Sequence, residues 1–214
     1  MVVGYTPYVN SINDILLEQE RVVSGMTRET ERCQKALALA ASGKSVALVS
    51  SGDAGIYGMA GLAMEIAAKE RLQVEIEVIP GVTAASAAAS LMGAPLMSDF
   101  AVISLSDLLV PWMVIETRLR AVAQADLVTC LYNPRSRTRK EPLKNALGIF
   151  RSFRPGNTIV GVAGNAGKES AAISLATLET VDEAEIDMHT TVIVGNSNGR
   201  ILQGHWVTLR GYQI

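Results

Sequence analysis

The chain has 214 residues, 49% of them hydrophobic and 19% charged, a balance typical of a globular protein with a substantial core. Its formal net charge of −2 argues against a general electrostatic attraction to nucleic acid. The longest stretch of low charge, residues 78–98, is interrupted by Gly and Pro and is too weakly apolar to span a membrane.

The first half of the chain alternates short apolar runs with Ala- and Leu-rich stretches of helical periodicity. The expected helices are 28–42, 54–70 and 83–92. The expected strands are 46–50, 74–79 and 101–105.

The second half continues the same rhythm. Helices are expected at 115–124 and 140–150, a short helix or turn at 169–175, and strands at 127–132, 158–163, 191–195 and 207–210. The alternation predicts an α/β fold with mixed sheets. The strand–turn pattern restarts near a connection that contains Pro111, which predicts two α/β domains, 1–108 and 109–214.

The strand at 46–50 leads into the segment Ser-Ser-Gly-Asp-Ala-Gly-Ile-Tyr-Gly. Asp53 is the only charged residue between residues 45 and 64, and glycines around it allow a ligand to approach the main chain. Ligands of open parallel sheets bind beyond the carboxyl ends of the strands, so this turn is a candidate small-molecule site. The alternative is a tight turn in which Asp53 caps the following helix, and the sequence leaves both open.

Common nucleotide and metal motifs are absent from the sequence. It contains neither Gly-x-x-x-x-Gly-Lys-Ser/Thr nor Gly-x-Gly-x-x-Gly, and Gly43-Lys44-Ser45 precedes its strand instead of following it. Cys33, Cys130 and two histidines lack metal-ligand spacing, so we expect no metal site. Both thiols are expected to be buried, in a cytoplasmic protein.

Four segments together resemble the corrin-forming branch of the tetrapyrrole methylases. They are Ser-Ser-Gly-Asp-Ala-Gly-Ile-Tyr (50–57), Ile-Pro-Gly-Val-Thr-Ala (79–84), Gly-Ala-Pro-Leu (93–96) and Leu-Tyr-Asn-Pro-Arg-Ser-Arg (131–137). Val-Gly-Tyr (3–5), residues 25–33 and Ser-Leu-Ser-Asp (104–107) are similar to the precorrin-3B C(17)-methyltransferases within it. Residues 25–33 and 104–109 most resemble the cobalt-dependent, anaerobic branch. The resemblance covers nearly the whole chain.

The start of the chain departs from the family pattern. Members of the family begin with a strand and a Gly-x-Gly-Pro-Gly loop, whereas Met1–Gly4 resembles their second strand. A strand, loop and helix of about 25–30 residues are expected to be missing.

The resemblance implies the tetrapyrrole methylase fold, with S-adenosylmethionine in a cleft between two domains, and a homodimer. The implied reaction is methylation of carbon 17 of precorrin-3B or cobalt-factor III, with ring contraction, in cobalamin biosynthesis. One alternative is an aerobic-pathway relative with a cobalt-free substrate. Another is a different corrin-ring methyltransferase of the same pathway, and a third is a non-catalytic binding protein that has lost its cofactor loop.

The resemblance also implies the residues that contact the cofactor. They are Asp53, Ala54, Gly55, Ile56, Thr83, Ala84, Tyr132, Asn133, Ala163, Gly164, Thr190 and Thr191. Asp53 could in addition offset the positive sulfonium. A helix cap at Thr83 and ordinary turn chemistry at the Gly and Thr positions are the alternatives.

The loop after the strand at 127–132 is rich in arginine. Arg135 and Arg137, with Ser106, are expected to bind the carboxylates of the tetrapyrrole, because guanidinium groups bind carboxylates in a bidentate manner. Asp107 and Ser104 are the candidates for proton transfer during catalysis. A solvated basic loop and a polar strand end are the structural alternatives.

Overall fold

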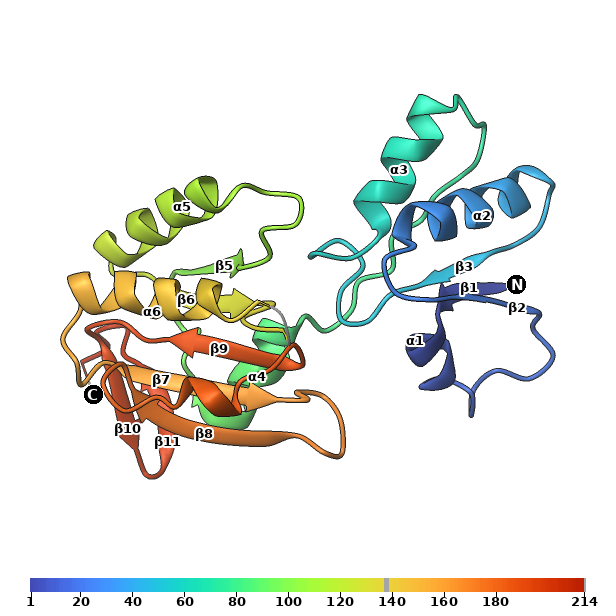
Figure 1. The fold of residues 1–214 in the computed structure, drawn as a ribbon. Coiled ribbons are helices and arrows are strands. Elements are labelled where there is room, and N and C mark those ends of the chain that lie inside the picture. Colours follow the sequence, from blue (N-terminus) through green and yellow to red (C-terminus); the bar gives the residue numbers. More distant parts are fainter. Residues whose placement is uncertain (137–138, 214) are drawn as a thin grey trace. The chain divides into compact units, whose positions relative to one another are not determined.

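The computed structural model describes residues 1–136 and 139–213 (Figure 1). The chain divides into two compact units, Met1–Thr83 and Ala84–Ile214, which are described in turn. The division falls earlier than the boundary expected after residue 108. The reason is that α4 (Ala84–Met92) packs against strands of the second unit.

The first unit is built on a three-stranded sheet in which every pairing is parallel. Its strands, in spatial order, are β2 (Arg21–Ser24), β1 (Val2–Tyr5) and β3 (Ala47–Val49). Its helices are α1 (Thr6–Asn10), α2 (Glu29–Ala41) and α3 (Ala60–Lys69). Helices α2 and α3 lie over one face of the sheet and α1 lies on the other (Figure 1).

The core of the first unit forms where α2 meets α3. Cys33 and Leu37 of α2 share a helix face and pack with Ala63 and Ile66 of α3. Strand β1 confirms the strand expected at the start of the chain. Strand β2 was not expected from the sequence, because it has only four residues.

Two expected elements of the first unit are corrected by the structure. Residues 74–79 do not form a strand, although Val74 and Ile76 pack on the core while Glu75 and Glu77 are exposed. The burial of residues 74–77 thus alternates as it would in a strand, but none of the strand pairings in the described part of the chain includes this segment. The helix expected from residue 54 begins only at Ala60, so Asp53 does not cap it.

The second unit contains a five-stranded sheet and a three-stranded sheet, both mixed, as the sequence predicted. In spatial order the larger sheet has β5 (Phe100–Ser104), β6 (Val128–Tyr132), β9 (Thr190–Val194), β7 (Ile159–Gly164) and β8 (Ala172–Thr177). The smaller sheet has β10 (Gly199–Leu202), β11 (His205–Thr208) and β4 (Gly93–Ala94). The helices besides α4 are α5 (Trp112–Gln124), α6 (Glu141–Phe153) and the 3₁₀ turn η1 (Glu183–Glu185).

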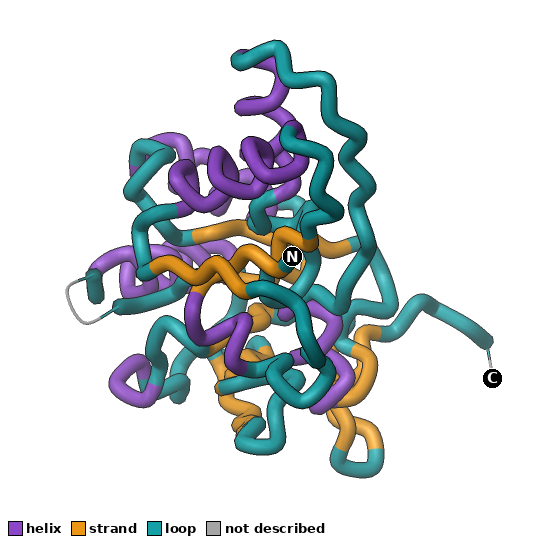
Figure 2. The backbone as a smooth tube through the Cα atoms, turned by 90° about the vertical axis from the view of Figure 1, so that its right-hand side faces the viewer, coloured by secondary structure: helices purple, strands orange, loops and turns teal. Residues whose placement is uncertain are grey.

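The larger sheet separates two apolar cores. Alternate strand residues such as Leu131 and Val192 pack with α5 and α6, while Cys130 and Ile193 pack with α4. Trp206 of β11 is fully buried in the α4 core. Figure 2 shows the helices in purple and the strands in orange. The short helix or turn expected at 169–175 is right only at residues 169 and 170, which lie in a turn, because the edge strand β8 begins at Ala172.

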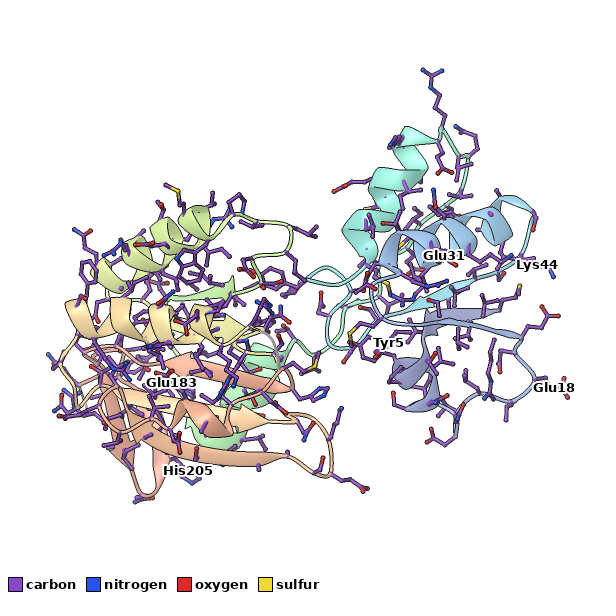
Figure 3. The ribbon with its side chains drawn as sticks, viewed as in Figure 1. Tyr5, Glu18, Glu31, Lys44, Glu183 and His205 are labelled. Carbon is purple, nitrogen blue, oxygen red and sulfur yellow. The ribbon has the colours of Figure 1, made fainter. Side chains whose placement is uncertain are left out.

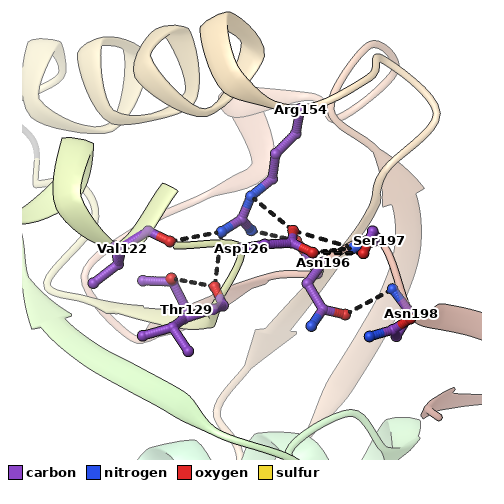
Figure 4. A network of polar contacts seen from close by, with 9 residues as sticks. Val122, Asp126, Thr129, Arg154, Asn196, Ser197 and Asn198 are labelled. Carbon is purple, nitrogen blue, oxygen red and sulfur yellow. Dashed lines mark hydrogen bonds and ion pairs between the residues drawn. The ribbon is translucent and has the colours of Figure 1, made fainter. Parts of the chain in front are cut away.

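A buried arginine ties together the ends of three elements at one end of the larger sheet (Figure 4). Arg154 is 6% exposed and donates hydrogen bonds to the carbonyl oxygens of Val122, Leu127 and Gly195. Asp126 Oδ1 lies 3.8 Å from Arg154 Nε and supplies a counter-charge. Burial lowers the pKa of Arg154, and Asp126 opposes that shift. The hydrogen bonds of Arg154 join main-chain carbonyls of three segments, so the role of the network is structural.

Candidate functional site

The loop that follows β3 is held in place by one carboxylate. Asp53 Oδ1 accepts the main-chain N–H of Gly55 at 2.8 Å, and Oδ2 accepts the N–H of Gly81 at 2.9 Å. The first bond closes a short local turn, while the second reaches a segment 28 residues further along the chain. Asp53 therefore joins two glycine-containing turns of the first unit.

Glycines allow these two turns to touch through their backbones. A Cβ atom on Gly81 would lie 2.1 Å from the carbonyl oxygen of Gly52, a distance that no side chain tolerates. Gly52 itself has φ = +72°, in the left-handed region that favours glycine. The two turns thus contact each other at the carboxyl end of β3, where the sequence predicted a ligand site.

The charge of this loop limits the ligands it suits. Hydrogen bonds from the N–H groups of Gly81 and Gly55 hold the pKa of Asp53 below its ordinary value, so its carboxylate is ionised at neutral pH. Exposed apolar side chains, Ile56 and Val82, flank it. An ionised carboxylate at this position suits a neutral or positively charged ligand better than a phosphate.

In the second unit, the expected site residues gather along one edge of the larger sheet, the edge that is formed by the ends of its strands. Parallel strands β5 and β6 both end there, with Ser104 paired to Tyr132. Strand β9 runs in the opposite direction and therefore begins at that edge, and β7 ends beside it. The residues brought together are Ser104, Tyr132, Asn133, Ala163, Gly164, Thr190 and Thr191.

Hydrogen bonds organise this edge. The hydroxyl of buried Tyr132 accepts the N–H of Ala85, in the first turn of α4, at 2.6 Å. Ser104 Oγ accepts Asn133 Nδ2 at 2.9 Å and the N–H of Ser106 at 3.2 Å. Three of the predicted residues thus form one small polar group at the ends of β5 and β6.

The charged candidates of the second unit already have protein partners. Arg139 Nη1 lies 3.4 Å from Asp107 Oδ1 and donates to the carbonyl oxygen of Leu105 at 3.1 Å. Arg135 donates to the main-chain oxygen of Glu183. Arg137, the other predicted carboxylate ligand, lies outside the described residues. The ion pair between Arg139 and Asp107 therefore joins the loop after β6 to the loop after β5.

Sequence reasoning missed three partners that the structure identifies. Gly81 supplies the second N–H to Asp53, and Ala85 supplies the N–H to Tyr132. Asp187 accepts a hydrogen bond from Thr190 Oγ1 at 2.8 Å. The bond from Thr190 to Asp187 spans only three residues and is local. The bonds of Gly81 to Asp53 and of Ala85 to Tyr132 join segments 28 and 47 residues apart, which no local pattern encodes.

The thiols are both free and buried, as the sequence predicted. Burial raises the pKa of Cys130 to about 12.

Within the described residues, no three His, Cys, Asp or Glu side chains are grouped as a metal site would require. Figure 3 shows His205 on the β10–β11 hairpin. None of the helices in the described ranges has the length and apolar character needed to cross a bilayer.

Comparison with known proteins gives consistent matches. Residues 1–182 match the family described as Tetrapyrrole (Corrin/Porphyrin) Methylases. A "Probable cobalt-factor III C(17)-methyltransferase" of Salmonella typhimurium is 49% identical over 214 residues, which cover 100% of this chain and 89% of the relative. The "Cobalt-factor III methyltransferase" of Priestia megaterium is 44% identical over 217 residues, covering all of this chain but only 40% of that longer protein.

A solved structure supports the same relationship. The crystal structure of "the methyltransferase CobJ" superposes with a TM-score of 0.89 at 35% identity, covering 97% of this chain and 87% of that one. The fold and the sequence of the chain therefore point to one family.

Proposed function

Because the chain belongs to the tetrapyrrole (corrin/porphyrin) methylases, we propose that it methylates carbon 17 of cobalt-factor III or a related precorrin, with ring contraction. The observation that carries the proposal is the 49% identity over the whole chain to a relative named as a probable cobalt-factor III C(17)-methyltransferase. The reaction would belong to cobalamin biosynthesis.

S-adenosylmethionine is the proposed methyl donor. When bound, it would supply a methyl group on a positively charged sulfur. The turn around Asp53 fits such a ligand, because it offers main-chain polar groups and exposed apolar side chains. Residues 53–56 and the pair Thr83 and Ala84 are the proposed contacts in the first part of the chain.

The second unit is proposed to contribute both cofactor and substrate contacts. Tyr132, Asn133, Ala163, Gly164, Thr190 and Thr191 are the proposed cofactor residues, supported by their meeting at one sheet edge. Methyl transfer needs close placement of two reactants and exclusion of water, and no covalent nucleophile from the protein. Small residues and main-chain groups suit that requirement.

Arginines are proposed to recognise the carboxylates of the substrate, with Ser106 beside them and with Ser104 and Asp107 in proton transfer. Arg135 to Ala should weaken tetrapyrrole binding and leave binding of S-adenosylhomocysteine near normal. Arg120 to Ala is the matched control, because Arg120 is exposed on α5 and forms an ion pair with Glu116 of the same helix. Loss of both affinities in the Arg135 variant would show that this residue is structural.

Calorimetric titration with S-adenosylmethionine and S-adenosylhomocysteine tests the cofactor directly. The proposal predicts saturable binding of both compounds at one site per chain. Absence of binding by the folded protein would contradict it. Light scattering on the same sample tests the further expectation of a homodimer.

A further inference from the structure

Both carboxylate oxygens of Asp53 accept hydrogen bonds from the protein's own main chain. Oδ1 accepts the N–H of Gly55 at 2.8 Å and Oδ2 accepts the N–H of Gly81 at 2.9 Å. Each bond involves a main-chain donor and a charged acceptor, which is the stronger class of protein hydrogen bond. The carboxylate is therefore oriented by the two turns.

The position of Gly81 depends on the same arrangement. Its missing Cβ would lie 2.1 Å from the carbonyl oxygen of Gly52 and 3.3 Å from the Cα of Asp53. Displacing either turn would break the bond from Gly81 to Asp53. The conformation of residues 52–56 and that of residues 79–82 are thus coupled through one side chain.

We infer that Asp53 is a positioning residue that fixes the main chain of the cofactor loop, and that it is not a selective counter-charge for the sulfonium. This inference rests on the proposed function, because it concerns binding of an adenosyl thioether at that loop. It predicts that Asp53 supports binding of the charged cofactor and of its neutral thioether product to the same extent.

The pair of ligands separates the two roles. S-adenosylmethionine and S-adenosylhomocysteine differ by one methyl group and one positive charge. A direct counter-charge would favour the sulfonium over the thioether, and its removal would change the ratio of the two dissociation constants. A positioning residue acts on the shape of the loop, and its removal would leave that ratio unchanged.

Two variants disturb the link from opposite sides. Asp53→Asn has nearly the same shape, but one carboxylate oxygen is replaced by an amide NH₂ group. That group is a donor and cannot accept the N–H of Gly55 or of Gly81. Gly81→Ala keeps the carboxylate charge and forces the turns apart by the clash with Gly52. Gly61→Ala is the control, since a Cβ at that position of α3 meets nothing within 4 Å.

The experiment is calorimetric titration of the full chain and its variants with both compounds, after a thermal melt at the same pH. Asp53→Asn and Gly81→Ala should each raise both dissociation constants about tenfold, with the ratio between them within about twofold of wild type. Gly61→Ala should bind both compounds with the dissociation constants of the wild type. If Asp53→Asn does not fold, Asp53→Ser replaces it, because a hydroxyl can keep the local bond to Gly55 N–H.

Selective loss of S-adenosylmethionine affinity in the Asp53 variant, with Gly81→Ala unaffected, would overturn the inference in favour of a counter-charge. Unchanged affinities in both variants would overturn it as well. Wild-type protein that binds neither compound would instead refute the proposed cofactor, and the inference with it.

Discussion

The hydroxyl of Tyr132, at the end of β6, accepts the main-chain N–H of Ala85 in the first turn of α4 at 2.6 Å. The two residues are 47 positions apart in the chain. This bond fixes the start of a helix made almost wholly of small residues against the strand ends where the candidate site residues meet. A residue expected only as a cofactor contact therefore also organises its surroundings.

Tyr132→Phe should lower the free energy of unfolding by about 1–2 kcal/mol, because it leaves the buried N–H of Ala85 without its acceptor. Urea unfolding measures the change. Tyr212→Phe is the control, since Tyr212 is 65% exposed. Equal stability of the two variants would show that the bond contributes nothing.

The pKa of Asp53 predicts how the loop responds to acid. Because hydrogen bonds from Gly81 and Gly55 lower that pKa, the stabilisation is complete above the unfolded value of about 3.9 and is lost as pH falls through the folded value. The stability difference between wild type and Asp53→Asn should thus be constant from neutral pH down to about pH 5. An NMR titration of the Asp53 carboxyl carbon with a midpoint above about 4 would contradict the hydrogen-bonded arrangement.

Arg154→Met should destabilise the protein by about 2–4 kcal/mol, because it removes the donor to the carbonyls of Val122, Leu127 and Gly195. The control is Arg120→Met, whose exposed ion pair with Glu116 should contribute about 0.5 kcal/mol or less. Thermal and urea unfolding of both variants checks the contrast. A loss in the Arg154 variant no larger than in the control would refute the role assigned to it.

Cys130 should resist thiol reagents in the folded protein. Its thiol is buried and has a pKa of about 12, so almost none is thiolate at pH 8. Labelling with a coloured disulfide reagent should be slow before denaturation and immediate after it. Rapid labelling of Cys130 in the folded protein would contradict the packing of the α4 core.

The α/β class and the strands β5, β6, β7 and β9 of the larger sheet were predictable, because apolar runs such as β6 are buried on both faces. The segment 74–79 was expected to be a strand and is not one. Val74 and Ile76 pack on the core there, but a strand also needs a partner, which periodicity does not supply.

The candidate site was predictable in part. The glycines around Asp53 marked the turn after β3, but the helix cap that they also suggested does not form, since α3 begins at Ala60. The links from Asp53 to Gly81 and from Tyr132 to Ala85 join segments distant in sequence. No local propensity specifies such contacts, because they arise only when the strands and α4 are assembled.

Methyl transfer from isotopically labelled S-adenosylmethionine to cobalt-factor III, followed by NMR of the isolated product, tests the central claim most directly. The expected product carries one labelled methyl group on carbon 17 of a ring-contracted tetrapyrrole. A labelled methyl group on another carbon would indicate a different corrin-ring methyltransferase. Binding of both compounds without any transfer would contradict the assignment of the chain as an enzyme.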